Sequence, residues 1–167
     1  GHDLYVMETG FRERQAISPG HNRVMRFEPR PGYFEPDPGI NVARSPAMSN
    51  DARTWPGSWP DRLLDADDPG WAGKWNGYFG QRPAADQESY TVMDDQYYDA
   101  WDFRPDSRDS TRYGLGLRVE VRGFQWANPQ AGNVIFWHYD ITNEGTTDYN
   151  DNIIFGLYMD SGVGGSA

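Results

Sequence analysis

The sequence predicts a mainly β protein, in which an antiparallel, sandwich-like sheet follows a long irregular segment rich in proline and glycine. Two observations support this prediction. Residues 1–85 contain 10 of the 12 prolines, and prolines at that spacing leave no room for long helices. Residues 86–167 contain runs of alternating apolar and polar side chains, which is the period of a strand. The expected division is an irregular wrapping segment, 1–85, and an antiparallel β domain, 86–167.

The irregular segment is interrupted every few residues by Pro-Gly pairs, as in Ser18-Pro19-Gly20 and Trp55-Pro56-Gly57. Such pairs favour turns and extended backbone. Aromatic and aliphatic side chains recur between them more often than in a flexible linker. We therefore expect a segment that wraps a folded surface, with disorder as the alternative for residues 1–50. The sequence assigns no role to residues 1–45.

The clearest strand signal is the alternation over residues 115–122, which we expect to continue past a bulge at Gly123. Arg118, Glu120 and Arg122 would line the polar face of this strand and form cross-strand ion pairs. The other expected strands are Ser89–Met93, Val134–Thr142 and, after a hairpin turn at residues 143–145, Ile153–Met159.

The predicted sheet is incomplete at its C-terminal end. Residues 160–167 form a glycine-rich loop with no closing strand, and four expected strands are fewer than the roughly seven of a typical sandwich. We interpret both ends as cuts inside a longer polypeptide. An unpaired strand edge would then be covered by something outside this chain.

Composition excludes several classes of function. The chain has 25 acidic and 15 basic residues and a formal net charge of −10, which disfavours binding to a phosphate backbone, so no nucleic acid is expected as a partner. No apolar run approaches the roughly 18 residues of a membrane span. Cysteine is absent, which removes disulfides, thiol catalysis and Cys-ligated zinc.

Tryptophans form the densest motif of the irregular segment. Trp55 and Trp59, and again Trp71 and Trp75, are separated by three residues, and Tyr78 follows closely. Exposed, coplanar rings of this kind bind the apolar faces of sugars. The alternative is that the tryptophans pin the irregular segment onto the sheet in place of the missing aliphatic residues.

Acidic side chains suggest calcium as the one cofactor to consider. The stretch Asp65–Gly70 has an Asp at its first and third positions, but Pro69 and Asn76 occupy places where an EF-hand needs ligands. A calcium ion in another loop would relieve the repulsion between clustered carboxylates. The alternative is a solvated acidic surface. The candidate ligands are Asp65, Asp67, Asp94, Asp95 and Asp160.

Catalytic motifs are sparse. The chain has three histidines, and no nucleophile elbow, zinc-protease motif or phosphate loop is present. We interpret His138 as a hydrogen-bonded strand residue, and we assign no catalytic residue. A pair of carboxylates acting as a glycosidase stays open as an alternative.

Four stretches of the chain share a pattern with known proteins, namely Trp75–Gly80, Ala85–Asp95, Gly114–Trp126 and Tyr139–Tyr149. They resemble segments of large, mostly uncharacterised secreted or cell-surface bacterial proteins that contain immunoglobulin- or fibronectin-like β modules. The resemblance spans about residues 45–165 and is a likeness of pattern. It implies an extracellular or cell-surface location and a chain longer than this one, and it implies no catalytic residues.

Three functions therefore stand as hypotheses. The first is a non-enzymatic structural or interaction module of an exported assembly, whose partners are other copies or other segments of that assembly. It predicts buried tryptophans and an open sheet edge. The second is a carbohydrate-binding module, which predicts that the tryptophan and tyrosine rings form an exposed row. The third is a fragment of a glycan hydrolase, which predicts two facing carboxylates, one with a raised pKa.

Overall fold

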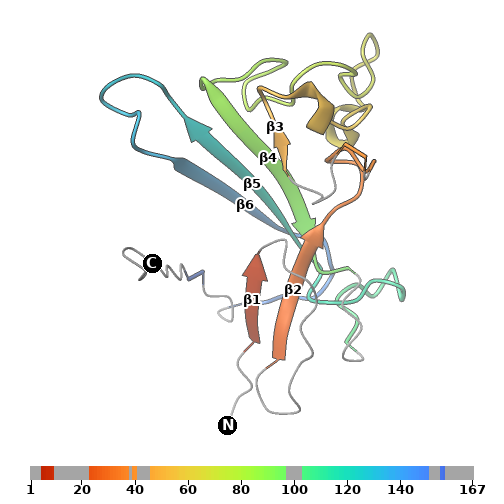
Figure 1. Ribbon diagram of the computed structural model, residues 1–167. Helices are drawn as coiled ribbons and strands as arrows, with labels where there is room; N and C mark the ends of the chain where they lie inside the picture. Colours follow the sequence, from red (N-terminus) through yellow and green to blue (C-terminus); the bar gives the residue numbers. More distant parts are fainter. Residues whose placement is uncertain are drawn as a thin grey trace.

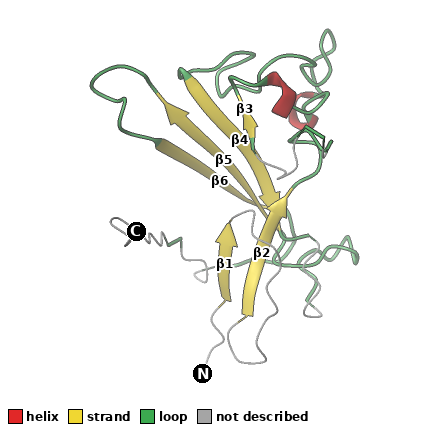
Figure 2. Ribbon diagram, in the orientation of Figure 1, coloured by secondary structure: helices red, strands yellow, loops and turns green. Residues whose placement is uncertain are grey.

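The computed structural model describes residues 5–9, 23–37, 39–40, 46–96, 103–150 and 155–156, with side chains from Phe27 onward. The prediction of a mainly β fold is confirmed, since the only helices among these residues are two short 3-10 turns, η1 (Ala52–Thr54) and η2 (Pro60–Arg62) (Figure 2). The strands are β1 (Tyr5–Thr9), β2 (Arg23–Pro29), β3 (Ala47–Met48), β4 (Gln87–Asp94), β5 (Leu117–Gln125) and β6 (Phe136–Asn143).

The described strands form one sheet in the order β1-β2-β4-β5-β6, and β3 also pairs with β4. Strands β4, β5 and β6 lie side by side as an antiparallel meander, and β6 is the last strand of the row (Figure 1). β2 meets β4 only at Glu28 and Pro29 and continues into a parallel pair with β1. The second layer of a sandwich stays a prediction.

The strand predictions for β4, β5 and β6 are correct to within a few residues. The predicted bulge at Gly123 is wrong, because the pairing stays regular there, with Gly123 between Ser89 and Trp137. A side chain at this position would meet Ser89 Oγ at 2.6 Å and the Trp137 ring at 2.9 Å. The glycine therefore admits a close approach by the Trp137 ring, which covers the exposed backbone. Of the predicted strand Ile153–Met159, only Phe155 and Gly156 are described, and neither is in a strand.

The register divides the side chains between two faces of the sheet. Tyr90 of β4, Arg122 of β5 and His138 of β6 are aligned and share one face, which we call face A. Thr91, Val121 and Tyr139 share the opposite face, called face B. Each face has a hydrophobic cluster on it. The cluster on face A contains Tyr33, Ala47, Trp59, Trp75, Tyr90 and Val92, and that on face B contains Phe27, Met93, Leu117, Val119 and Val121.

The irregular segment covers face A near β4 and is fixed there by its tryptophans. The Trp59 and Trp75 side chains are 1% and 2% exposed, and their rings meet edge to face at 5.8 Å. The Trp75 indole N–H donates to Glu88 Oε2 at 2.7 Å, and that of Trp59 donates to the Lys74 carbonyl at 2.8 Å. Buried indoles need such partners. The tryptophans therefore pin the segment to the sheet, as the structural interpretation of the motif predicts.

The polar face expected for β5 is partly buried under this segment. Arg122 is 2% exposed, lies 3.9 Å from the Tyr90 ring centroid, and donates from Nη1 to the Asn76 carbonyl at 2.6 Å. The expected cross-strand ion pairs are also corrected. Glu120 pairs with Arg118 at 3.1 Å and with Arg122 at 3.5 Å, both on its own strand, because Asp140 is its partner on β6.

Candidate functional site

The most unusual surface of the described structure is strand β6. Trp137 and Ile141 on face B are 57% and 41% exposed, whereas Val119 and Val121, beside them on β5, are 3% and 6% exposed. The other face of β6 is also open, since Phe136, His138 and Asp140 are exposed. Scattered apolar residues on a surface are ordinary, but contiguous ones on a single strand mark an interaction site.

The outer edge of β6 has backbone groups that no described strand pairs. Glu144 N–H donates to the Gly116 carbonyl at 2.8 Å, one step beyond the β5–β6 pairs and in the same register. Hydrogen-bonded pairs alternate along an antiparallel ladder. It follows that Phe136, His138, Asp140 and Thr142 turn their N–H and C=O groups toward β5. Trp137, Tyr139 and Ile141 turn theirs toward the open edge.

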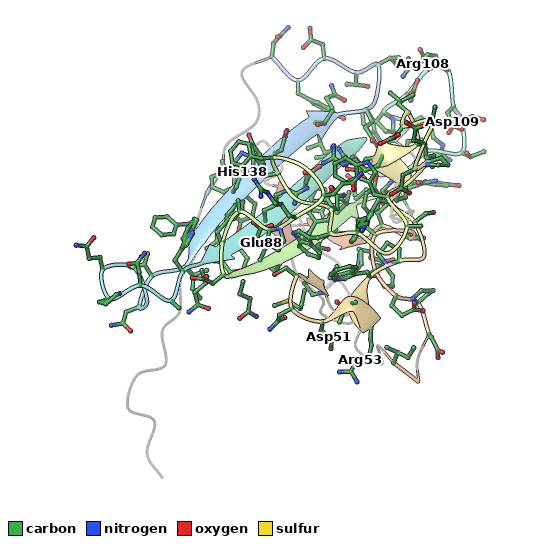
Figure 3. The ribbon with its side chains drawn as sticks, turned by 90° about the horizontal axis from the view of Figure 1, so that it is seen from above. Asp51, Arg53, Glu88, Arg108, Asp109 and His138 are labelled. Carbon is green, nitrogen blue, oxygen red and sulfur yellow. The ribbon has the colours of Figure 1, made fainter. Side chains whose placement is uncertain are left out.

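Face A of β6 carries two ionisable side chains, His138 and Asp140. Asp140 lies opposite Glu120, and within the described residues it has no ion pair. His138 lies opposite Arg122, and its ring meets that of Tyr78 at 5.4 Å. Figure 3 shows a loop passing beside His138 on this side of the sheet. The Asp140 carboxylate and the His138 imidazole therefore lie on the same face of the outermost strand. On β5, Asp140 faces another carboxylate and His138 faces a guanidinium group.

The residues predicted to bind sugars do not form one exposed row. Trp59 and Trp75 are buried, so their faces are not available for stacking, and the predicted platform is corrected at these two positions. Trp55 and Trp71 pack against the same cluster and are partly buried. Tyr78 is exposed, but Phe79 and His138 stand at 78° and 77° to its ring. Glycan binding elsewhere on the chain stays a prediction.

The acids predicted to bind calcium lie in separate places. Asp65 accepts hydrogen bonds from the backbone of Asp67 and Asp68 and from the Trp71 indole, and Asp67 is exposed. Asp160 lies outside the described residues. Within the described ranges, no group of three or more His, Asp or Glu side chains has the spacing to hold a metal ion. Calcium stays a prediction.

Asp94 and Asp95 already have a cation beside them. Arg112 lies 3.9 Å from Asp94 and 3.3 Å from Asp95, and Arg30 lies 3.6 Å from Asp94. Burial raises the pKa of Asp95 to about 6, against the lowering effect of a hydrogen bond from the Leu115 N–H and of Arg112. A raised carboxyl pKa is a feature of glycosidase acids. Asp94 and Asp95 are successive residues, and both are buried beside the same arginine. A pair of carboxylates acting as a glycosidase stays a prediction.

Comparison with protein-family models, curated protein sequences and solved structures finds no match to this chain. In the part of the chain that the structure describes, no helix is long and apolar enough to cross a membrane. An unpaired sheet edge was expected because residues 160–167 offer no closing strand, and among the described strands the open edge is that of β6. The signal for β6 was present in residues 134–142, where apolar residues occur on both faces. That pattern is typical of a strand covered on both sides.

Proposed function

We propose that this chain is a non-enzymatic interaction module of an exported or surface-associated assembly, and that it binds its partner by adding a strand to the open edge of β6. One observation supports this proposal most strongly. Among the strand residues from Phe27 onward, whose side chains are described, the exposed large apolar side chains all belong to β6, and they occur on both of its faces. Strand addition is a common mode of recognition, in which main-chain hydrogen bonds give affinity and alternate side chains give specificity.

The pattern of exposure favours a neighbouring strand over a covering sheet. If a whole layer were absent above face B, Val119 and Val121 in the middle of the sheet would be exposed as well. They are buried, in a cluster with Phe27, Met93 and Leu117. A strand beside β6 would place its side chains next to Phe136 on face A and next to Trp137 on face B. One added element would then cover both exposed faces.

The described residues that follow β6 contact other parts of the fold. Thr146 and Thr147 donate their N–H groups to the Pro105 carbonyl at 2.9 Å. Tyr149 donates its hydroxyl to the Leu115 carbonyl at 2.6 Å and packs against the face B cluster. The Phe155 ring meets that of Tyr139 at 5.6 Å, on face B. These contacts place the described part of the C-terminal segment on face B, and none of them involves the outward backbone groups of β6.

Proline substitution tests this function, because Ile141 and Thr142 differ in which way their N–H groups point. The probe is a short peptide that alternates valine with lysine and threonine, titrated into the chain at a concentration where the chain is monomeric. We expect the peptide to shift and protect the amides of Trp137, Tyr139 and Ile141 in NMR spectra. Ile141→Pro removes an outward N–H and should abolish this binding while the sheet stays folded.

Thr142→Pro is the matched control, since it removes an N–H that points toward β5. We expect it to destabilise the β5–β6 pairing itself, which thermal unfolding would show as a lower midpoint. A peptide that leaves the outward amides of β6 unchanged would overturn the proposed function. Binding that Ile141→Pro does not weaken would overturn it as well.

A further inference from the structure

We infer that the partner of β6 is a second copy of the same chain, paired antiparallel to it about a two-fold axis at Tyr139. This inference rests on the proposed function, because it specifies which strand occupies the open edge. A two-fold axis makes the interface self-complementary, so that each contact occurs twice. β6 therefore has to complement its own sequence when that sequence is read in reverse.

The backbone satisfies this condition. With the axis at Tyr139, the residue pairs across the interface are Tyr139 with the partner's Tyr139, and Trp137 with the partner's Ile141. Trp137, Tyr139 and Ile141 are the residues whose N–H and C=O groups point outward. Each outward donor then faces an outward acceptor. The pairing leaves the β5–β6 hydrogen bonds untouched, and it extends the sheet from one copy into the next.

The ionisable side chains of β6 are also self-complementary in this register. In this register His138 lies directly opposite the partner's Asp140, and Asp140 lies opposite the partner's His138. These are non-hydrogen-bonded pairs, in which side chains approach most closely. Arg122 lies beside His138 on β5, and its positive charge also favours a carboxylate at that position. Asp140, which faces only Glu120 within its own sheet, gains an imidazole N–H donor.

The neighbouring symmetric registers are poorer. An axis at Asp140 places that carboxylate opposite the partner's Asp140, which is repulsive. An axis at His138 places two imidazoles opposite each other and leaves Asp140 facing the partner's Phe136. Among these three registers, the one centred on Tyr139 gives both ionisable residues a complementary partner.

The side chains of face B complete the match. Trp137 faces the partner's Ile141, and the two Tyr139 rings face each other across the axis. Aromatic–aliphatic and aromatic pairs are among the cross-strand contacts that stabilise antiparallel sheets. Both side chains of the first pair are exposed in the single copy, so dimer formation removes apolar surface from water.

Net charge makes a further prediction about salt. Each copy has a formal charge of −10, so two copies repel each other at long range. Salt screens this repulsion, with a Debye length of about 8 Å at physiological ionic strength. A homodimer should therefore tighten as salt is raised, whereas a complex with a basic partner should loosen.

Charge exchange at positions 138 and 140 tests the register. His138→Glu creates two acid–acid pairs across the axis, and Asp140→Lys creates two pairs between imidazole and ammonium. We expect each single variant to raise the dimer dissociation constant about tenfold or more in sedimentation equilibrium. Mixing the two variants in equal amounts should restore dimers, because the introduced glutamate of one copy then faces the introduced lysine of the other.

The outcomes separate this inference from the proposed function. A chain that stays monomeric at high concentration, but still binds the strand peptide through its outward amides, would overturn the second copy and leave the proposed function standing. A chain that neither dimerises nor binds the peptide would overturn both. Dimers that both single variants leave unchanged would overturn the pairing described here. Circular dichroism of each variant confirms that the sheet is intact.

Discussion

Strands β4 and β6 belong to the same sheet and both contain many apolar residues, but their surroundings are opposite. β4 pairs with β5 on one side and with β2 and β3 on the other, and most of its side chains are buried. β6 pairs with β5 alone among the described strands, and most of its side chains are exposed. The difference shows that apolar residues in this chain have two environments, a folded core at β4 and an open surface at β6.

The irregular segment accounts for the difference. Its tryptophans and Asn76 cover face A over β4 and the buried Arg122 of β5. At β6 the Tyr78 ring of this segment meets that of His138, but His138 stays exposed. A chain with 37% hydrophobic residues thus buries the strands in the middle of the sheet and leaves most side chains of the edge strand β6 exposed.

The largest expected effect contrasts two tryptophans. Trp59→Ala removes a buried ring that contacts Trp75 and Tyr90, and it should lower the free energy of unfolding by about 3–5 kcal/mol. Trp137→Ala removes an exposed ring that covers Gly123, and it should cost the monomer about 1 kcal/mol while weakening dimer formation. Chemical denaturation at low protein concentration measures both. Equal losses of monomer stability would contradict the contrast between the two strands.

A smaller effect concerns pH and the buried end of β4. The pKa of Asp95 is about 6 in the folded state and near its ordinary value of 3.8 when unfolded, so the folded state binds this proton more tightly. The stabilisation is fully present below pH 3.8 and is lost as pH rises through 6. We expect the free energy of unfolding to increase by about 2 kcal/mol as pH falls from 7 to 4.

Asp95→Asn should remove this dependence, and Asp106→Asn is the control. The Arg108 hydrogen bonds lower the pKa of Asp106 to about 2, so the stabilisation from this carboxylate is lost only as pH falls from 3.8 through 2. The pH dependence of thermal unfolding between pH 4 and 7 should therefore disappear in the first variant and stay unchanged in the second. If the wild type and Asp95→Asn show the same pH dependence over this range, the carboxyl of Asp95 does not have a raised pKa in the folded state.

Sequence periodicity was enough to predict β4, β5 and β6, because alternation is a local property of the chain. It was not enough to predict the burial of Arg122, since the side chain depends on Asn76, which lies 46 residues away. The sequence could not decide whether the tryptophans bind sugars or pack against the sheet. That depends on whether Trp59 and Trp75 are exposed, which is set by the tertiary fold. The same limit applied to β6. Its apolar residues on both faces indicate a strand that is covered on both sides, but the pattern does not identify what packs against it.

Amide hydrogen exchange along β6, measured by NMR over a range of protein concentrations, tests the central claim most directly. We expect the amides of His138 and Asp140, which point toward β5, to be protected at every concentration. The amides of Trp137, Tyr139 and Ile141 should exchange rapidly in the dilute chain and become protected only as dimers form. Alternate amides that are equally protected in the monomer, or outward amides that stay unprotected in the dimer, would contradict an open edge that is closed by a second copy.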